Sequence, residues 1–532
     1  MPKSIFKLLT LFFVLLLVSC AKRGTITGGD KDTIAPILKE SFPKNYSTHF
    51  KGNEIRLVFN EYVKLKNLNK QLVVSPFMKN EPLISPTNAS KVITIKIKDT
   101  LKENTTYSFN FGQSIEDNNE GIPLSQFKYV FSTGNVIDSL KLKVTIKDAL
   151  ENKVPSFVTV MLYEVDEKFT DSTIYKKPPT YIANTLDSLK TVTLENVKQG
   201  KYRLVALKDN GNNVFNPKVD KIGFQKDYID LPETQPTIYE LELFKEVVAF
   251  KTHNPFQAAG NKIVCGYDGK EIGLKAVLKN GNTILPSVVN QFKGKDSLQV
   301  WFKPIKADSL QLELSKDKFN KILSVKTKEM PADSLSFSVD YSGNLPLRER
   351  FSITSSTPLL QFDSSKITIT NKDSTAIAYT KEYDEWNQKL YLDFEKQPLE
   401  RYRIQLLPGA ITDFFDEAND TLIYKVSTKN LSDYGNLKVV LENAKSFPII
   451  VELTDKDGKV KASSYTLDNP VVEFLALEPS LYTLRIIYDE NKNGIWDTGS
   501  YLEKRQTEEV IYFPKPLDVR ANWDVEQPFN LK

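Results

Sequence analysis

Period-two alternation of apolar and polar residues runs through most of this chain and restricts its fold more than any other feature. Apolar side chains occupy every second position in five clear segments: 93–97, 107–111, 140–146, 202–206 and 390–394. Successive side chains of a β-strand point to opposite faces, so this pattern is typical of strands with one buried face. Amphipathic helical spacing over three turns is hard to find. The sequence therefore predicts an all-β protein.

Turn signals separate these segments. Asn-Gly occurs at 280–281 and 493–494, and Asp-Gly occurs at 268–269 and 457–458. Both dipeptides suit the positive φ of tight hairpin turns. A chain of 532 residues is long enough for several domains. Many short strands at regular spacing therefore favour β-sandwich modules in series.

Composition excludes several classes of function. The formal net charge is +4 and no basic stripe stands out, so nucleic acid is not an expected partner. The chain has two histidines, His49 and His253, and neither lies in a metal-binding pair. Triad hydrolysis and metallohydrolysis both need a histidine near a nucleophile or metal. We expect no catalytic residues, no enzyme activity and no cofactor beyond a possible calcium ion.

The first 20 residues combine two lysines, Lys3 and Lys7, an apolar run from Leu8 to Val18 and the sequence Leu-Val-Ser-Cys ending at Cys20. The apolar run is too short to span a bilayer and suits a secretory signal. The cut before a cysteine resembles the bacterial lipoprotein signal. The resemblance implies that Cys20 becomes the mature N-terminus and carries acyl chains such as palmitate. A plain signal peptide and a transmembrane anchor are the alternatives.

The residues after Cys20 are small, polar and rich in glycine up to Asp30, which predicts a flexible tether. Position two is Ala21, and by resemblance to known sorting rules this favours the outer membrane, with the periplasmic face preferred over the cell surface. The other cysteine, Cys265, lies in an apolar strand-like run and is predicted to be a buried small hydrophobe rather than a nucleophile.

Two kinds of internal repeat are visible. The first runs from Glu54 through Asn104-Thr105-Thr106-Tyr107 to Phe131-Ser132-Thr133, and resembles a bacterial Ig-like domain of the S-layer-protein type. A looser copy begins near Asp333. The second kind pairs 200–224 with 481–513, each a Tyr-containing strand, an Asn/Gly loop and a further strand. These resemble transthyretin-like or carboxypeptidase-regulatory-like modules.

The repeats lead to a complete division of the chain: a signal peptide (1–19), a lipidated tether (20–33), an Ig-like domain (34–135), a transthyretin-like sandwich (136–246), a degenerate Ig-like sandwich (247–332), an Ig-like sandwich (333–430) and a transthyretin-like sandwich (431–532). The arrangement resembles a family of Bacteroidetes outer-membrane lipoproteins, through Gly28-Gly29-Asp30, Phe59-Asn60-Glu61 and the tail around Trp523. The resemblance implies a cellular localisation and a domain architecture, but no established biochemical activity.

The segment from Asp489 to Asp497 is the most specific binding motif in the sequence. Oxygen-bearing side chains fall at positions one, three, five and nine, with glycine at six, which is the ligand order of a calcium loop. The expected ligands are Asp489, Asn491, Asn493, the backbone carbonyl of Ile495, and Asp497. Ser500 replaces the bidentate glutamate at position twelve, which Glu503, Glu508 or Glu509 could supply. The alternative is a hairpin turn rich in Asx residues. A weaker sister loop begins at Asp209.

Asp followed by Ser or Thr and a small or aliphatic residue recurs along the chain and resembles the O-glycosylation sequon of Bacteroidetes. The predicted acceptors are Ser139, Ser188, Ser297, Ser309 and Ser334, and the alternative is a loop-end Asp-Ser before a strand. Tyrosines at 107, 202, 402 and 482 open late strands, and we expect them to bond back to loop backbone. The four tryptophans are expected in cores or between modules rather than in a sugar-stacking platform.

These features favour a non-catalytic outer-membrane lipoprotein that acts as a β-sandwich scaffold or protein-binding arm in a cell-envelope complex. Its expected partners are the membrane, through the N-terminal lipid, and one or more envelope proteins. A cell-surface carbohydrate-binding or adhesive lipoprotein is the alternative.

Overall fold

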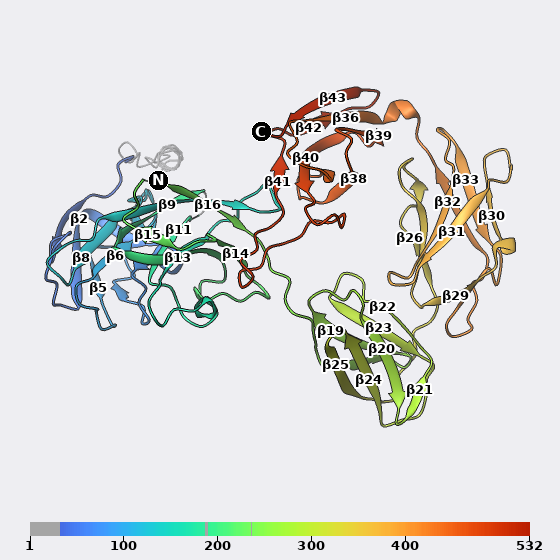
Figure 1. Cartoon of the computed structure of the whole chain (residues 1–532), viewed down its shortest axis with the longest axis horizontal. Coiled ribbons are helices and arrows are strands. Elements are labelled where there is room, and N and C mark those ends of the chain that lie inside the picture. The colour runs from blue at the N-terminus through green and yellow to red at the C-terminus, as the bar shows by residue number, and fades with distance from the viewer. Residues whose placement is uncertain (1–31, 187–189, 236) are drawn as a thin grey trace, which may run out of the picture. The chain divides into compact units, whose positions relative to one another are not determined.

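The computed structural model describes residues 32–186, 190–235 and 237–532. Contacts divide the chain into two compact units, one running to Ser139 with Asn196–Lys198 and the other comprising Leu140–Glu195 and Gln199–Lys532. Almost all regular structure in the described residues is β-strand, which confirms the predicted all-β fold of tandem sandwiches (Figure 1). We refer to the sheet pairs, in chain order, as modules 1 to 5.

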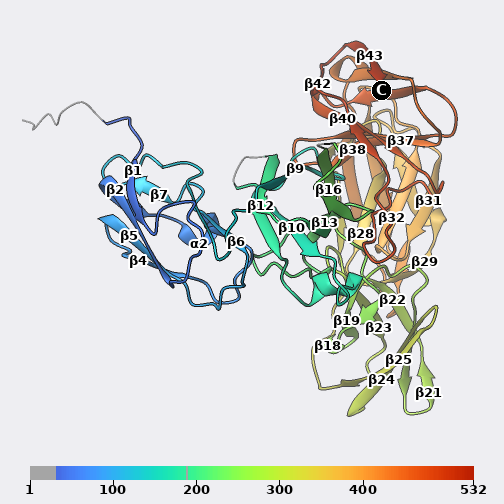
Figure 2. The ribbon, with the colours of Figure 1, turned by 60° about the vertical axis from the view of Figure 1, so that its left-hand side comes forward.

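Module 1 contains two sheets and one helical turn. The first sheet has the order β1 (Leu38–Phe42), β2 (Glu54–Leu65), β5 (Ser90–Lys96), β4 (Leu83–Ser85), with β7 (Ile115–Asp117) also on β2; the second has β3 (Val73–Ser75), β6 (Thr106–Asn110), β8 (Lys128–Ser132). The helix α2 spans Leu68–Gln71. Figure 2 shows β2, β5 and β4 of the first sheet and β6 of the second. Ile93, Ile95 and Phe109 lie in the core of this module, as their alternation predicts.

Module 2 pairs a larger and a smaller sheet. The larger has the order β11 (Tyr181–Asn184), β10 (Thr159–Glu164), β13 (Gly200–Lys208), β14 (Lys221–Phe224), with β15 (Ile229–Leu231) also on β13; the smaller has β12 (Thr191–Val197), β9 (Leu140–Asp148), β16 (Ile238–Leu243). A 3₁₀ turn, η1, spans Asp171–Tyr175. The last strand, β16, pairs in parallel with the first, β9.

Module 5 repeats this strand order. Its larger sheet is β38 (Val460–Thr466), β37 (Ile449–Thr454), β40 (Ser480–Tyr488), β41 (Val510–Tyr512), with β42 (Leu517–Val519) also on β40; its smaller sheet is β39 (Val471–Leu477), β36 (Gly435–Glu442), β43 (Asp524–Asn530). Here too the last strand pairs in parallel with the first. The same topology therefore occurs at both segments that carry the second sequence repeat.

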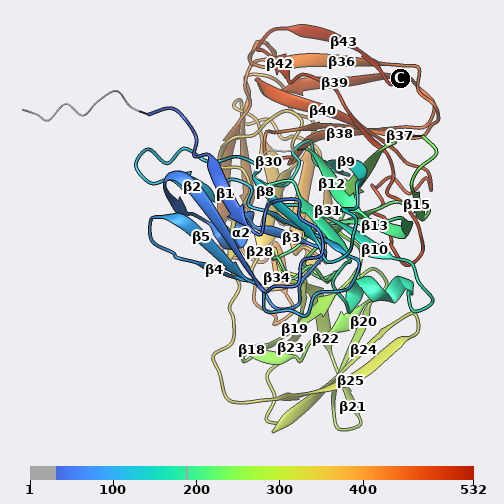
Figure 3. The same ribbon diagram turned by 90° about the vertical axis from the view of Figure 1, so that its left-hand side faces the viewer.

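Modules 3 and 4 are further sandwiches. Module 3 has β17 (Lys251–Thr252), β19 (Lys262–Asp268), β23 (Ser297–Phe302), β22 (Ser287–Gln291) and β18 (Phe256–Ala259) in one sheet, and β21 (Thr283–Leu285), β20 (Lys275–Asn280), β24 (Ser309–Lys316), β25 (Phe319–Lys326) in the other (Figure 3). The Asn280-Gly281 dipeptide lies at the β20–β21 hairpin, as its sequence predicts: Asn280 pairs with Thr283, and the turn between them is Gly281 and Asn282, with Gly281 at φ 58°.

Module 4 is built from three groups of strands: β26 (Phe337–Val339), β28 (Phe351–Ser355), β32 (Lys389–Phe394), β31 (Tyr379–Asp384); β27 (Gly343–Asn344), β35 (Leu422–Ser427), β33 (Arg401–Leu406), β30 (Ile367–Thr370); and β29 (Leu359–Phe362) with β34 (Ile411–Asp413). Short 3₁₀ turns follow β29 and β35: η2 (Ser364–Lys366) and η3 (Leu431–Asp433). Leu390, Leu392 and Phe394 lie in its core, in agreement with their alternation.

The larger sheet of module 2 departs from simple alternation. Residues 202–207 of β13 are buried without interruption, and so are residues 159–163 of β10. Val205 and Met161 are paired on one face of this sheet and belong to an apolar cluster with Phe224, Phe244 and residues of module 5. We call this the outer-face cluster. A strand with one solvated face would show alternating buried and exposed residues. The unbroken burial of β10 and β13 therefore indicates that both faces of this sheet are covered.

Candidate functional site

The segment after β40 begins with a tight turn around Asp489. The Asp489 side chain is 2% exposed, and its carboxylate accepts hydrogen bonds from the backbone N–H groups of Asn493 (3.1 Å) and Gly494 (2.7 Å). Gly494 has φ 77°, a conformation that favours glycine. Burial alone would raise the pKa of Asp489, but the backbone donors and a hydrogen bond from the Tyr465 side chain outweigh it and lower the pKa.

Asparagine side chains complete the turn. The Asn491 and Asn493 amides both donate to one oxygen of Asp497, the second at 2.6 Å. The side-chain oxygen of Asn491 accepts from Asn493 N–H at 3.1 Å, and that of Asn493 accepts from Ile495 N–H at 2.9 Å. These are Asx-turn bonds, so the loop closes through its own donors. The ligand order and the Asx-turn interpretation thus describe the same five residues.

Of the three glutamates expected to replace the missing ligand, Glu508 is the one whose carboxylate reaches the loop. It is 6% exposed and accepts from the N–H groups of Glu490 and Asp497, both at 2.9 Å. Glu503 pairs with Arg505, and Glu509 pairs with Lys445. Burial, with the nearby charge of Asp489, raises the pKa of Glu508.

In the part of the chain that the structure describes, no three histidine, cysteine, aspartate or glutamate side chains cluster in a way that could hold a metal ion. Asparagine and carbonyl ligands, which the calcium hypothesis requires, lie outside that criterion. Calcium at 489–497 stays a prediction, as does calcium at the sister loop, where Asp209 accepts from Asn213 N–H at 2.7 Å.

The remainder of the same loop packs on module 2. Tyr501 is completely buried in the outer-face cluster, where its ring meets Phe224 edge to face with centroids 5.2 Å apart. Trp496 is half-buried against the same cluster. Gly499 lies so close to Phe244 that an added Cβ would stand 2.6 Å from the ring. A side chain at 499 would therefore prevent this contact.

Polar contacts fix the register of the docked loop. The Thr498 hydroxyl donates to the carbonyl of Lys245 at 2.8 Å, Tyr501 N–H donates to the Glu246 carboxylate, and the Gln506 amide donates to the carbonyl of Phe224 at 3.0 Å. Burial raises the pKa of Glu246 despite the donor from Tyr501. We call residues 496–507 the docking loop.

A second contact lies on β40 itself. Arg485 is 5% exposed and forms an ion pair with Glu452 on β37 at 2.6 Å. Its guanidinium also donates to the carbonyl of Leu150 at 2.8 Å, and the Tyr512 hydroxyl donates to the same carbonyl. Burial opposes charge on Arg485, but Tyr512 and Glu452 outweigh it, so the net pKa of Arg485 is raised.

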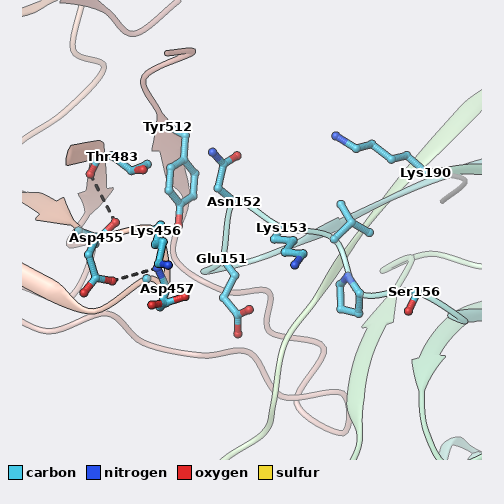
Figure 4. Close-up of a pocket in the computed structure, with 14 residues that line it drawn as sticks. Glu151, Asn152, Lys153, Ser156, Lys190, Asp455, Lys456, Asp457, Thr483 and Tyr512 are labelled. Carbon is cyan, nitrogen blue, oxygen red and sulfur yellow. Dashed lines mark hydrogen bonds between the residues drawn. The ribbon is translucent and has the colours of Figure 1, made fainter. Parts of the chain in front are cut away.

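A polar cavity of about 560 Å³ lies beside this contact. Figure 4 shows the segment from Glu151 to Ser156 opposite the turn that carries Asp455, Lys456 and Asp457, with Tyr512 at one side. Acidic and basic side chains line it together. The cavity follows from the docking of module 5 on module 2.

The predicted modification sites are not brought together. Cys20 and Ser188 lie outside the described residues. Ser139, Ser309 and Ser334 are exposed, which suits glycosylation at these three, and Ser297 is half-buried.

Several structural interpretations are confirmed. Cys265 is fully buried, and burial raises the pKa of its thiol to about 11. Both histidines are exposed. The hydroxyls of Tyr107 and Tyr402 accept from the N–H groups of Lys102 (2.9 Å) and Gln397 (2.6 Å), and Tyr482 donates to the carbonyl of Glu478 (2.7 Å).

The tryptophans differ in how deeply they are buried. Trp301 is fully buried between modules 3 and 4 against Phe414 and Phe415, and Trp496 packs on module 2. Trp523 is 53% exposed, contrary to expectation, because it lies in the turn before β43 with Arg520 over its ring.

None of the helices in the described residues has the length and apolar character that a bilayer crossing requires.

Comparison with known families matches residues 32–133 to the bacterial Ig-like domain, so the first module is similar to domains of this type. The match falls on the segment for which the sequence predicts an Ig-like domain. No curated protein matches the chain.

Solved structures give distant likenesses. The surface layer protein SbsC, domains 1–6, is 11% identical over 91% of this chain and 67% of that one, with a TM-score of 0.16. Salmonella α2-macroglobulin reacted with methylamine is 10% identical over 92% of this chain and 43% of that one, at 0.15. BcpA, the major pilin subunit of Bacillus cereus, is 9% identical over 74% and 99%, at 0.14. Matches at this level carry no statement about function.

Proposed function

We propose that this protein is a non-catalytic outer-membrane lipoprotein, anchored through acylated Cys20, whose sandwiches form a scaffold or protein-binding arm in a cell-envelope complex. The periplasmic face is favoured. The observation that carries the scaffold role is the docking of module 5 on module 2 through Tyr501. A chain that inserts a loop from one module into an apolar cluster of another holds those modules in a fixed relation.

Such a frame would bind proteins through exposed sheet edges. An edge strand presents unpaired N–H and C=O groups on which an extended segment of another chain can add. Among the edge strands of the described sheets, β25 is the longest, with 8 residues in unbroken register on β24. Ile322, in the middle of β25, is 62% exposed. We assign the protein-binding role to this edge.

Crosslinking of intact envelopes followed by mass spectrometry tests the assignment. The wild-type chain is expected to crosslink to a protein partner through residues of β25, and Ile322→Lys is expected to remove that crosslink. Ile284→Lys is the matched control, because Ile284 lies on β21 at the opposite edge of the same sheet and is 65% exposed. Equal partner recovery from both variants would contradict the assignment, and absence of any protein partner would contradict the scaffold role.

The anchor is tested separately. Cys20→Ser removes the thiol that would be acylated, so the variant is expected in the soluble fraction while the wild-type chain remains in the outer membrane. Membrane retention of the variant would refute the lipid anchor. Protease treatment of whole cells then distinguishes the faces: an intact chain supports the periplasmic side, and cleavage supports the surface alternative.

A further inference from the structure

A second cavity, of about 510 Å³, lies where module 3 meets module 4. Its walls come from β19, β22 and β23 with the residues after β22, and from β28, β32 and the turn before β32. The two walls are joined by a backbone hydrogen bond of 2.9 Å from Gln291 N–H to the carbonyl of Trp386. The buried Trp301, with Phe414, forms an apolar contact between the same modules. The volume is within the usual range of small-ligand sites.

The cavity has a one-sided charge. Three lysines line it, Lys262, Lys293 and Lys389, and no carboxylate is among the described residues that line it. Lys262 pairs with Asp333, and Lys389 pairs with Asp340 at 2.6 Å. These two lysine charges are therefore neutralised by carboxylates that do not line the cavity. Lys293 is exposed and lies outside ion-pair distance of the described carboxylates, although its charge helps to lower the pKa of Asp340. Three lysines face two nearby carboxylates, Asp333 and Asp340, so the cavity has a net charge of about one positive unit.

The lining also holds an unsatisfied donor. Gln388 is 7% exposed, and its side-chain nitrogen has no hydrogen-bond partner. A buried amide without a partner lowers stability, and here it lines a cavity, where a bound molecule could accept its hydrogen bond. Opposite it, Gln299 is also 7% exposed; its amide nitrogen is held by Asn290 and by the carbonyl of Gln291, which leaves its oxygen as an acceptor.

We propose that this cavity binds an acidic monosaccharide unit, a hydroxyl-rich ring that carries one carboxylate. Lys293 supplies the charge that meets the carboxylate. Gln388 donates to one ring hydroxyl and Gln299 accepts from another, and the half-buried Tyr391, whose ring also contacts the Arg350 guanidinium at 4.3 Å, lines the same cavity. Mixed donors and acceptors around a single net charge suit such a molecule better than a compact polyanion, which needs several uncompensated cations. The site goes beyond the proposed scaffold role and does not depend on it.

Calorimetric titration of the full mature chain with D-glucuronate is the direct test, with D-glucose and inorganic phosphate as the comparison probes. We expect saturable binding of D-glucuronate, at least tenfold weaker binding of D-glucose, and no competition by phosphate at equal concentration. Equal binding of D-glucose, effective competition by phosphate, or no binding of D-glucuronate would each overturn the proposal.

Two variants locate the binding. Lys293→Gln is expected to weaken D-glucuronate binding by roughly ten- to hundredfold, as loss of a charge-assisted hydrogen bond does. Lys306→Gln is the control, because Lys306 is exposed on the same module and does not line the cavity. Gln388→Leu is expected to abolish binding without lowering the melting temperature, because it removes an unpaired buried donor. A lower melting temperature with unchanged binding would show that Gln388 is structural and would overturn its assignment.

Discussion

The guanidinium of Arg485 donates a 2.8 Å hydrogen bond to the carbonyl of Leu150, 335 residues earlier in the chain. The same side chain is held by Glu452 within its own sheet. The Arg485 side chain of module 5 thus hydrogen-bonds to the backbone of module 2 and contributes to the docking of the two modules.

Replacing Arg485 should weaken the docking strongly. In Arg485→Ala, Glu452 would lose its partner while 15% exposed, and breaking a buried ion pair costs about 3–5 kcal/mol. Hydrogen exchange of the docking loop should accelerate accordingly. Arg520→Ala is the control, because the Arg520–Asp518 pair is 60% and 46% exposed and should contribute about 0–1 kcal/mol. Equal exchange in both variants would show that Arg485 does not hold the modules.

Tyr501 belongs to module 5, but its side chain is expected to stabilise the docking of module 5 on module 2. Tyr501→Ala empties a fully buried site in the outer-face cluster and should destabilise the docked state by about 3–5 kcal/mol. Limited proteolysis should then cut within 496–507. Leu467→Ala, at a side chain 69% exposed in the same module, should leave the cleavage pattern unchanged. Resistance of Tyr501→Ala to cleavage would contradict the docking.

The docking should weaken as the pH rises. Burial raises the pKa of Glu246 above its ordinary value, although Tyr501 N–H and Arg505 oppose this and Glu503 reinforces it. The folded state therefore favours the protonated carboxyl, and its contribution is full below the ordinary pKa and lost as pH passes the raised value. Glu508 shifts in the same direction.

Hydrogen exchange of the docking loop, corrected for the intrinsic rate, should show more opening at pH 7.5 than at pH 5. Glu246→Gln should reduce this difference, because a neutral amide does not titrate. A pH dependence that is unchanged in Glu246→Gln would assign the effect to other groups.

Calcium should stabilise the loop at 489–497 if the ligand order is functional. Millimolar calcium should then raise the melting temperature by about 2–4 °C for each kcal/mol of binding free energy, and magnesium should not. Asp497→Asn should abolish the shift, and Asp209→Asn in the sister loop should preserve it. No shift in the wild-type chain would leave the Asx-turn interpretation as the full account of these residues.

A strand-opening tyrosine is expected to stabilise module 4 through one hydrogen bond. Tyr402→Phe leaves Gln397 N–H without its 2.6 Å partner and should cost about 1–3 kcal/mol. Tyr379→Phe, which loses a 3.2 Å bond to Ser364 near the surface, should cost less. Denaturant unfolding of the two variants measures the difference, and equal values would argue against a tyrosine corner.

Local patterns predicted much of this fold. Alternation at Ile93–Ile97 and Leu390–Phe394 placed strands and their buried faces, and Asn280-Gly281 placed a hairpin turn, because strand periodicity and positive φ depend on neighbouring residues alone. The internal repeat likewise located two segments that share one strand order.

The docking was not predicted, because it joins residues that are far apart in sequence and no periodicity marks it. Two signals were nevertheless present. The apolar run from Val158 to Tyr163 does not alternate, which indicates a strand buried on both faces. Arg485 interrupts an apolar strand, and a buried arginine needs a partner. Neither signal could name Leu150 or Tyr501 as that partner.

The insertion of Tyr501 into module 2 has a consequence for cleavage of the backbone. A protease cut within 247–430 would break the covalent connection between modules 2 and 5. The packing of Tyr501 in the outer-face cluster and the hydrogen bond from Arg485 to Leu150 would remain intact. The two fragments should therefore migrate as one species in native gels and separate only when denatured.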